Sequence, residues 1–184
     1  MSTLKAGDKA PDFTTTDQNG QPVKLSGYKG KKVVLYFYPK DDTPGCTAEA
    51  CSLRDNYKAL QKAGYTVLGI STDAEKRHIK FIAKYSLPFT LLSDEDKKVH
   101  DLYGTWIEKQ LYGRKYMGTA RVTFIINEKG VIDEVIEKVN TKNHAQQILG
   151  EEITPAVKLP EEKVVAKKAA VKKAAGNKKA AKKK

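Results

Sequence analysis

One stretch constrains the fold more than any other part of the chain: the apolar run Val33–Tyr38, which stops at Pro39 and is followed by a polar turn. A continuous apolar run predicts a central strand that is covered on both faces, since half-buried strands alternate apolar and polar residues. Thr43 and Pro44 come next, and these residue types are favoured at the N-cap and the first position of a helix. The sequence therefore places a buried strand directly before a helix N-terminus.

Both cysteines of the chain lie on this predicted helix. Cys46 falls at its third position, where backbone N–H groups are unpaired and the helix dipole is positive. These effects favour the thiolate, which is the reactive form of cysteine, so we expect Cys46 to be an attacking thiolate at a redox site. A buried structural cysteine is the alternative, but such a residue has no need of the Thr-Pro-Gly helix start.

Cys51 lies one and a half helical turns further on. On a regular helix the two Cα atoms are roughly 8–9 Å apart, whereas a disulfide tolerates less than about 7 Å. Cys46 and Cys51 therefore cannot bridge unless the helix unwinds locally, and we expect them to be unbridged in the reduced protein.

No metal or cofactor is expected. Two cysteines cannot complete a tetrahedral zinc site, and the histidines show no ligand spacing with them. His78, His100 and His144 lie on predicted helices among charged neighbours, and we expect all three at the surface.

Strand-like and helix-like segments alternate along the rest of the chain. This order predicts a mixed central β-sheet flanked by helices on both faces. A thioredoxin-like α/β fold with an N-terminal β-hairpin fits best, because a hairpin precedes the last helix; a flavodoxin-like sheet is the alternative. The expected strands are 12–16, 22–25, 33–38, 65–71, 89–92, 121–127 and 131–136. The expected helices are 43–64, 72–87, 93–102 and 141–149, and Ile79 is expected in the buried stripe of the second. Residues 103–120 are expected to form a loop or irregular hairpin.

The net charge of +12 is concentrated at the C-terminal end. Residues 158–184 hold eleven Lys and two Glu, a charge of +9, which leaves +3 for residues 1–157. A tract of Lys, Ala and Val cannot bury enough apolar surface to offset its ordering entropy. We therefore expect a folded domain at 1–152 and a disordered basic tail at 153–184.

No apolar run approaches the ~20 residues needed to span a bilayer, so no membrane association is expected. The first residues contain no apolar segment typical of a signal peptide, which points to the cytoplasm. Close cysteine pairs there are more often catalytic than structural.

The pattern Pro39-x-x-x-Thr43-x-x-Cys46 resembles the active-site motif of the peroxiredoxins. The longer string from Tyr36 to Cys51 is similar to the peroxiredoxin Q, or bacterioferritin comigratory protein, subfamily. The resemblance covers about residues 4–150. It continues through the segments Arg54-Asp55, Leu68–Asp73, Phe89–Asp94, Tyr103–Trp106 and Arg121–Phe124.

This resemblance implies a thiol-dependent peroxidase for hydrogen peroxide and organic hydroperoxides. Cys46 would attack the peroxide and become a sulfenic acid, with Thr43 positioning the peroxide, Pro39 shielding the sulfur and Arg121 holding the thiolate charge. Cys51 would resolve the sulfenic acid to an intramolecular disulfide.

The resemblance further implies that a thioredoxin-type protein reduces this disulfide, and it favours a monomer. Glu49 is either a charge that assists Arg121 or a residue that suits the start of the helix. A thioredoxin-like disulfide exchanger is the main alternative enzyme, but Cys-x4-Cys is not its Cys-x-x-Cys motif.

Three roles are open for the tail: a solvated extension, non-specific nucleic-acid binding, and attraction to an anionic membrane surface. The last is disfavoured because the tail lacks aromatic and leucine anchors. If the tail binds nucleic acid, its lysines would neutralise phosphates and release the counterions bound to them.

If the tail binds nucleic acid, truncation at residue 157 is expected to weaken DNA binding at least about tenfold and to leave peroxide turnover unchanged. The measurement is a DNA titration of the full and truncated chains at several salt concentrations. Binding that is insensitive to salt, or that survives truncation, contradicts the electrostatic role.

Overall fold

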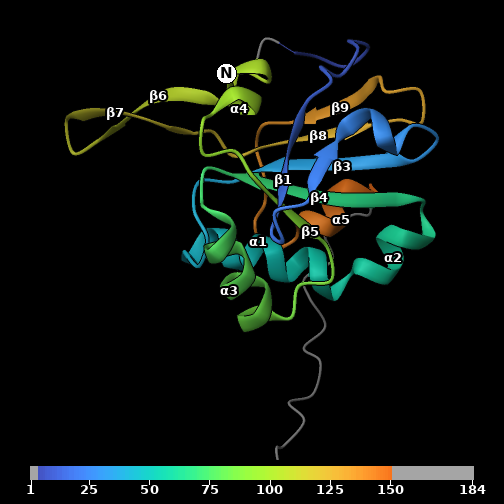
Figure 1. Cartoon of the computed structure of the whole chain (residues 1–184), viewed down its shortest axis with the longest axis horizontal. Helices are drawn as coiled ribbons and strands as arrows, with labels where there is room; N and C mark the ends of the chain where they lie inside the picture. Colours follow the sequence, from blue (N-terminus) through green and yellow to red (C-terminus); the bar gives the residue numbers. More distant parts are fainter. Residues whose placement is uncertain (1–3, 151–184) are drawn as a thin grey trace, which may run out of the picture. The chain divides into compact units, whose positions relative to one another are not determined.

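The computed structural model describes residues 4–150 of the 184-residue chain, and the predicted 153–184 tail lies outside that range. Figure 1 shows a central sheet with helices packed against it and a separate hairpin. The strands are β1 (Thr14–Asp17), β2 (Pro22–Lys24), β3 (Lys32–Phe37), β4 (Tyr65–Ser71), β5 (Thr90–Ser93), β6 (Trp106–Leu111), β7 (Arg114–Thr119), β8 (Val122–Ile126) and β9 (Ile132–Ile136). The helices are η1 (Leu25–Tyr28), a 3-10 turn, and α1 (Pro44–Asp55), α2 (Tyr57–Lys62), α3 (Glu75–Tyr85), α4 (Lys98–Leu102) and α5 (His144–Leu149).

The central sheet has the strand order β2-β1-β5-β4-β3-β8-β9. Strands β3, β4 and β5 run parallel, whereas β1–β2, β1–β5, β3–β8 and β8–β9 pair antiparallel. The predicted mixed sheet and the N-terminal hairpin are therefore confirmed. Strand β3 lies in the interior of the sheet, between β4 and β8, and the chain leaves its end to enter α1.

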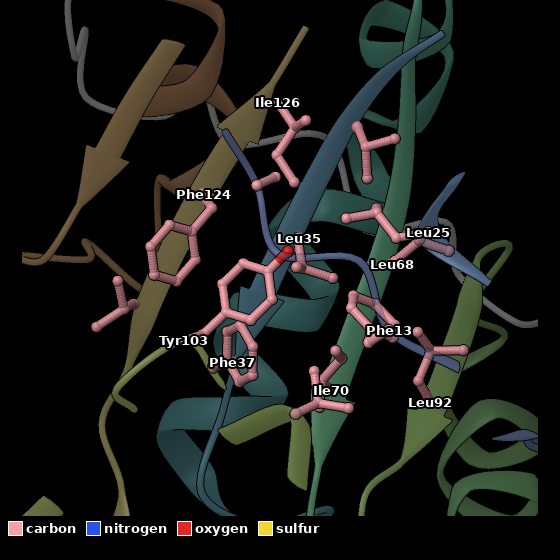
Figure 2. Packing of buried hydrophobic residues seen from close by; sticks show 14 of the residues in the cluster. Phe13, Leu25, Leu35, Phe37, Leu68, Ile70, Leu92, Tyr103, Phe124 and Ile126 are labelled. Carbon is pink, nitrogen blue, oxygen red and sulfur yellow. The ribbon is translucent and has the colours of Figure 1, made fainter. Parts of the chain in front are cut away.

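Side chains alternate along β3, and this alternation creates two cores. Val33, Leu35 and Phe37 point to the face covered by the N-terminal segment and α4, where Phe37 packs against Tyr103 and Phe124 (Figure 2). Val34, Tyr36 and Tyr38 point to the opposite face, under α1, α2, α3 and α5. Burial on both faces explains why the strand is apolar at every position.

The cysteine helix is not continuous to residue 64 as predicted. Asn56 breaks it into α1 and α2, with φ −106° and ψ 13°. The Asn56 side-chain amide donates to the Ser52 carbonyl at 2.9 Å, competing with the backbone bond that would continue the helix.

Two further helix predictions need correction. Ile79 is 48% exposed on α3 and does not belong to the buried stripe, which holds Phe81. The helix expected to open at Ser93 begins at Lys98 instead, because the Asp94 carboxylate accepts the N–H groups of Val99 and His100. Lys97, the N-cap residue of α4, adopts a left-handed backbone conformation.

Residues 103–120 include a regular two-stranded hairpin, in which Trp106 pairs with Thr119 and Glu108 with Met117. This confirms the hairpin alternative for that stretch. The hairpin projects from the body of the sheet (Figure 1).

The prediction that the three histidines are surface residues is wrong, since each is 0% exposed. His78 Nδ1 lies 2.8 Å from Asp41 Oδ2, and His100 Nδ1 lies 2.5 Å from Asp94 Oδ2. Hydrogen-bond partners let these imidazoles be buried: Asp41 lies 37 positions from His78, and Asp94 lies six positions before His100 in the turn that opens α4.

Gly69 on β4 leaves room for two neighbouring side chains to pack against the strand. A Cβ at this position would lie 2.7 Å from Leu91 Cδ2 and 2.7 Å from the Tyr36 ring. Gly69→Ala is therefore expected to lower the free energy of unfolding by about 1–3 kcal/mol, measured by urea denaturation. The control is Gly27→Ala, whose Cβ meets nothing within 4 Å; an equal effect of the two changes contradicts the packing argument.

Candidate active site

Cys46 lies in the first turn of α1, which begins at Pro44 as predicted. The preceding residue, Thr43, is extended (φ −98°, ψ 151°), and its carbonyl accepts the N–H of Thr47 at 2.8 Å. Cys46 is 2% exposed. The sulfur is therefore held in a largely dry site beside the unpaired N–H groups of the helix start.

The family resemblance implies that Thr43 positions the peroxide through its hydroxyl. In the structure this hydroxyl donates to the Lys40 carbonyl at 3.0 Å and makes no capping bond to the helix. Pro39 is half-buried at the end of β3, between the strand and this turn. The two residues thus shape the entry to the helix.

Arg121, which the family resemblance singles out, contacts Cys46 from the position just before β8. Its Nη2 donates to Cys46 Sγ at 3.2 Å, although the two residues are 75 positions apart. The register explains the encounter: Phe37, the last residue of β3, pairs with Val122 of antiparallel β8, so Arg121 lies where the chain turns towards α1. A permanent cation at this distance favours the thiolate form of Cys46.

Gly45 makes room for this cation. A Cβ at position 45 would lie 3.3 Å from Arg121 Nη2, closer than most side chains tolerate. The Thr-Pro-Gly motif is therefore a helix start whose last residue also leaves space for the guanidinium. The motif was visible in the sequence, but its partner was not.

Glu49 is the second acidic partner of Arg121. Its Oε2 accepts a hydrogen bond from Arg121 Nη1, and the carboxyl group is 0% exposed. Burial raises the pKa of Glu49 to about 7, and Arg121 opposes that shift without cancelling it. The other oxygen, Oε1, has no hydrogen-bond partner. Of the two roles left open from the sequence, an acidic group that acts on Arg121 matches this geometry.

His144 approaches the same carboxyl group from α5, and sequence reasoning missed it. Its Nε2 lies 2.8 Å from Thr123 Oγ1 and 3.7 Å from Glu49 Oε1. Burial lowers the pKa of His144 to about 4, with a smaller contribution from the charge of Arg121. The imidazole is therefore neutral near pH 7 and supplies no charge to the site.

Cys51 is half-buried on α1, and both cysteines are free thiols in the intact helix, as predicted. Hydrogen bonding to Asp55 raises the pKa of Arg54. Arg54 also donates to the Tyr85 carbonyl at 2.8 Å, tying the end of α1 to the end of α3.

The turn before Cys46 is tied to the same end of α3. Asp42 adopts a left-handed conformation with φ 58°. Its carboxylate accepts hydrogen bonds from Lys84 Nζ at 2.8 and 2.7 Å and from the Tyr85 hydroxyl at 2.6 Å. The last turn of α3 therefore holds both flanks of the cysteine segment.

A cavity of ≈ 280 Å³ lies beside Arg121, between the start of the β6–β7 hairpin and the chain after β9. Its wall is apolar at Ile107, Ala120 and Val122. No cluster of residues suited to a metal ion occurs within residues 4–150, and no helix there is long and apolar enough to cross a membrane.

A helix that starts directly after the central strand of a thioredoxin-like sheet, with a buried thiol against a guanidinium, defines a thiol-based oxidoreductase. Residues 6–135 match the AhpC/TSA family, and the chain belongs to that family.

Curated relatives place the chain more narrowly. It is 52% identical over 147 residues to a putative peroxiredoxin bcp from Coxiella burnetii, covering 80% of this chain and 97% of the relative. It is 48% identical over 149 residues to peroxiredoxin Bcp from Escherichia coli K12, covering 81% of this chain and 96% of the relative. Peroxiredoxins are thiol-dependent peroxidases, so the chain is an oxidoreductase of this class.

Solved structures of peroxiredoxins are also similar to this chain. PrxQ from Xylella fastidiosa, solved as a cysteine-to-serine mutant, superposes with a TM-score of 0.76 at 31% identity, covering 82% of this chain and 96% of that one. The bacterioferritin comigratory protein of Xanthomonas campestris, solved in work on its alkyl peroxide reduction activity, gives 0.73 at 33% identity, covering 79% and 95%. The resemblance to the peroxiredoxin Q subfamily is confirmed.

His144 is expected to make stability depend on pH. Its pKa lies below the ordinary 6.5 in the folded chain, so acid protonates the unfolded chain first. The stabilisation is present above pH 6.5 and is lost as the pH falls towards 4, by up to about 3 kcal/mol. The measurement is the free energy of unfolding by urea, for the wild type and His144→Gln, between pH 4 and 7. If this free energy has the same pH dependence in the two proteins, the role of His144 is contradicted.

Proposed function

We propose that this chain reduces peroxides through Cys46, with Arg121 activating the thiolate and Cys51 resolving the oxidised sulfur. The single observation that carries the proposal is the 3.2 Å contact from Arg121 Nη2 to Cys46 Sγ at the start of α1. A buried thiol with a fixed cation and a free helix N-terminus is poised to act as a nucleophile.

In the first step, the Cys46 thiolate attacks the terminal oxygen of the peroxide. The S–O bond forms as the O–O bond breaks, which leaves a sulfenic acid and an alcohol or water. Arg121 stabilises charge on the sulfur and on the oxygens as it develops. Thr43 positions the peroxide and Pro39 limits the access of water, as the family motif implies. For Thr43 this requires its hydroxyl to exchange the Lys40 carbonyl for the substrate.

In the second step, Cys51 attacks the sulfenic sulfur and releases water to form the disulfide. Both thiols lie on one intact helix in the reduced protein, so α1 unwinds between them before they join. A thioredoxin-type dithiol then reduces the disulfide and returns the helix to its starting form.

Organic hydroperoxides are proposed as substrates beside hydrogen peroxide. The cavity next to Arg121 has an apolar wall, formed by Ile107, Ala120 and Val122, that suits an alkyl group. The relative from Xanthomonas campestris was studied for alkyl peroxide reduction, which supports the same substrate class here.

The remaining proposals concern the setting of the enzyme. We propose a monomer that works in the cytoplasm, where a thioredoxin-type reductant keeps Cys46 and Cys51 as thiols. We also propose that residues 1–152 form the enzyme and that the basic segment 153–184 adds non-specific contacts with nucleic acid. The lysine-rich composition of that segment supports the last point.

Replacing each cysteine separates the two steps. Cys46→Ser is expected to abolish peroxide turnover, whereas Cys51→Ser is expected to retain the first turnover and to lose recycling by thioredoxin. The measurement is peroxide consumption with thioredoxin, thioredoxin reductase and NADPH, beside a single-turnover assay.

Mass spectrometry after one equivalent of peroxide is expected to show a Cys46–Cys51 disulfide in the wild type. Turnover that survives Cys46→Ser rules out the proposed nucleophile. Normal recycling of Cys51→Ser means that Cys51 does not resolve the sulfenic acid.

A further inference from the structure

The site contains one guanidinium and two acids that compete for it. Arg121 donates through Nη1 to Glu49 and through Nη2 to Cys46 Sγ. Cys46 is 2% exposed and Glu49 is 0% exposed, so neither anion is stabilised by bulk water. If both were ionised, one buried cation would face two buried anions, and an uncompensated buried charge is costly.

The orphaned oxygen of Glu49 indicates how the site avoids this cost. A buried carboxylate normally has hydrogen-bond donors on both oxygens, yet Oε1 of Glu49 has none. An oxygen without a partner costs less on a neutral carboxylic acid than on a carboxylate, because the acid carries no net charge. The raised pKa of Glu49 agrees with that form.

Apart from Arg121, the described groups around Glu49 bring no positive charge to its carboxyl group. His144 on α5 is neutral near pH 7, and the pKa of Tyr36 on β3 is raised well above its usual value by burial and by the charge of Glu49. Lys109 on β6 interacts with the charges of Arg121 and Cys46, and its Nζ donates to the Thr119 carbonyl. Burial raises the pKa of Glu49 and Arg121 lowers it, so the carboxyl group depends on how much of the Arg121 charge Cys46 also uses.

We propose that Cys46 and Glu49 share a single proton across Arg121, and that Glu49 gives up this proton when Cys46 is oxidised. Glu49 does not touch the reacting sulfur, so it is a positioning residue that acts through Arg121. In the reactive form Cys46 is the thiolate and Glu49 is the neutral acid. After oxidation the sulfur is neutral, and the Glu49 carboxylate becomes the sole anionic partner of Arg121.

The step balances in atoms and charge. The sulfur lone pair forms the S–O bond with the terminal OH of the peroxide, and the electron pair of the broken O–O bond stays on the leaving oxygen. That oxygen takes up one proton while Glu49 loses one. Thiolate, neutral acid and peroxide thus become sulfenic acid, carboxylate and alcohol or water, with no net proton taken from solvent.

This inference rests on the proposed function of Cys46, and proton counting tests it separately. The full-length Cys51→Ser protein, which stops at the sulfenic acid, is mixed with one equivalent of hydrogen peroxide in weak buffer containing a pH indicator. The experiment is repeated with Glu49→Gln added, and with Glu134→Gln added as the control, since Glu134 is an exposed acid on β9. Dimedone labelling measures the sulfenic acid formed.

At pH 6 the Cys51→Ser protein and its Glu134→Gln control are expected to take up close to no protons per sulfenic acid, and the Glu49→Gln protein about one. Equal uptake with and without Glu49 overturns the inference. A lack of sulfenic acid in Cys51→Ser instead overturns the proposed function.

A second measurement does not depend on the folding of a Glu49 variant. In Cys51→Ser itself, proton uptake is expected to rise from near zero at pH 6 to near one at pH 8.5, because Glu49 is already ionised at the higher pH. Uptake that is constant across this range overturns the inference. In Glu49→Gln the rise is expected to disappear, an effect that a purely structural role of Glu49 would not produce.

Discussion

The contact between Arg121 and the Cys46 sulfur is the interaction on which the rest of the site depends. A thiol in the first turn of a helix already experiences the unpaired N–H groups of the backbone, but these are fixed partial charges. Arg121 adds a full and permanent charge at 3.2 Å, and it also holds Glu49. The sulfur and the Glu49 carboxyl group therefore share one cation, which is the basis of the coupling we propose between them.

The pairing of strands in the central sheet fixes the position of Arg121 relative to Cys46. Arg121 lies on no helix of the active site; it is placed by the antiparallel pairing of β8 with the central strand β3. A shift of that register by one residue would move the guanidinium to the other face of the sheet. The apolar residues of β3 and β8, buried in both cores, prevent such a shift because each one has a defined face.

Much of the fold and of the candidate site was predictable from local sequence. The strand at β3, the helix start at Pro44 and the two unbridged cysteines follow from residue types within a short span. Position 121 was suggested by a motif resemblance, because nothing local distinguishes it from a surface charge. The buried state of His144 and the break at Asn56 were not predictable, since each depends on hydrogen bonds made in the folded chain. Glu49 remained ambiguous until its burial was known.

The ties between α3 and the cysteine segment have a consequence for the speed of disulfide formation. Asp42 before Cys46 and Arg54 after Cys51 are both held by the last turn of α3. When the helix between them opens with these ties intact, the segment behaves as a short tethered loop instead of a free chain. Its ends are already together, so little further loop-closure entropy opposes the encounter of the sulfurs. Cys51 then meets the oxidised sulfur at the high effective concentration of an intramolecular reactant.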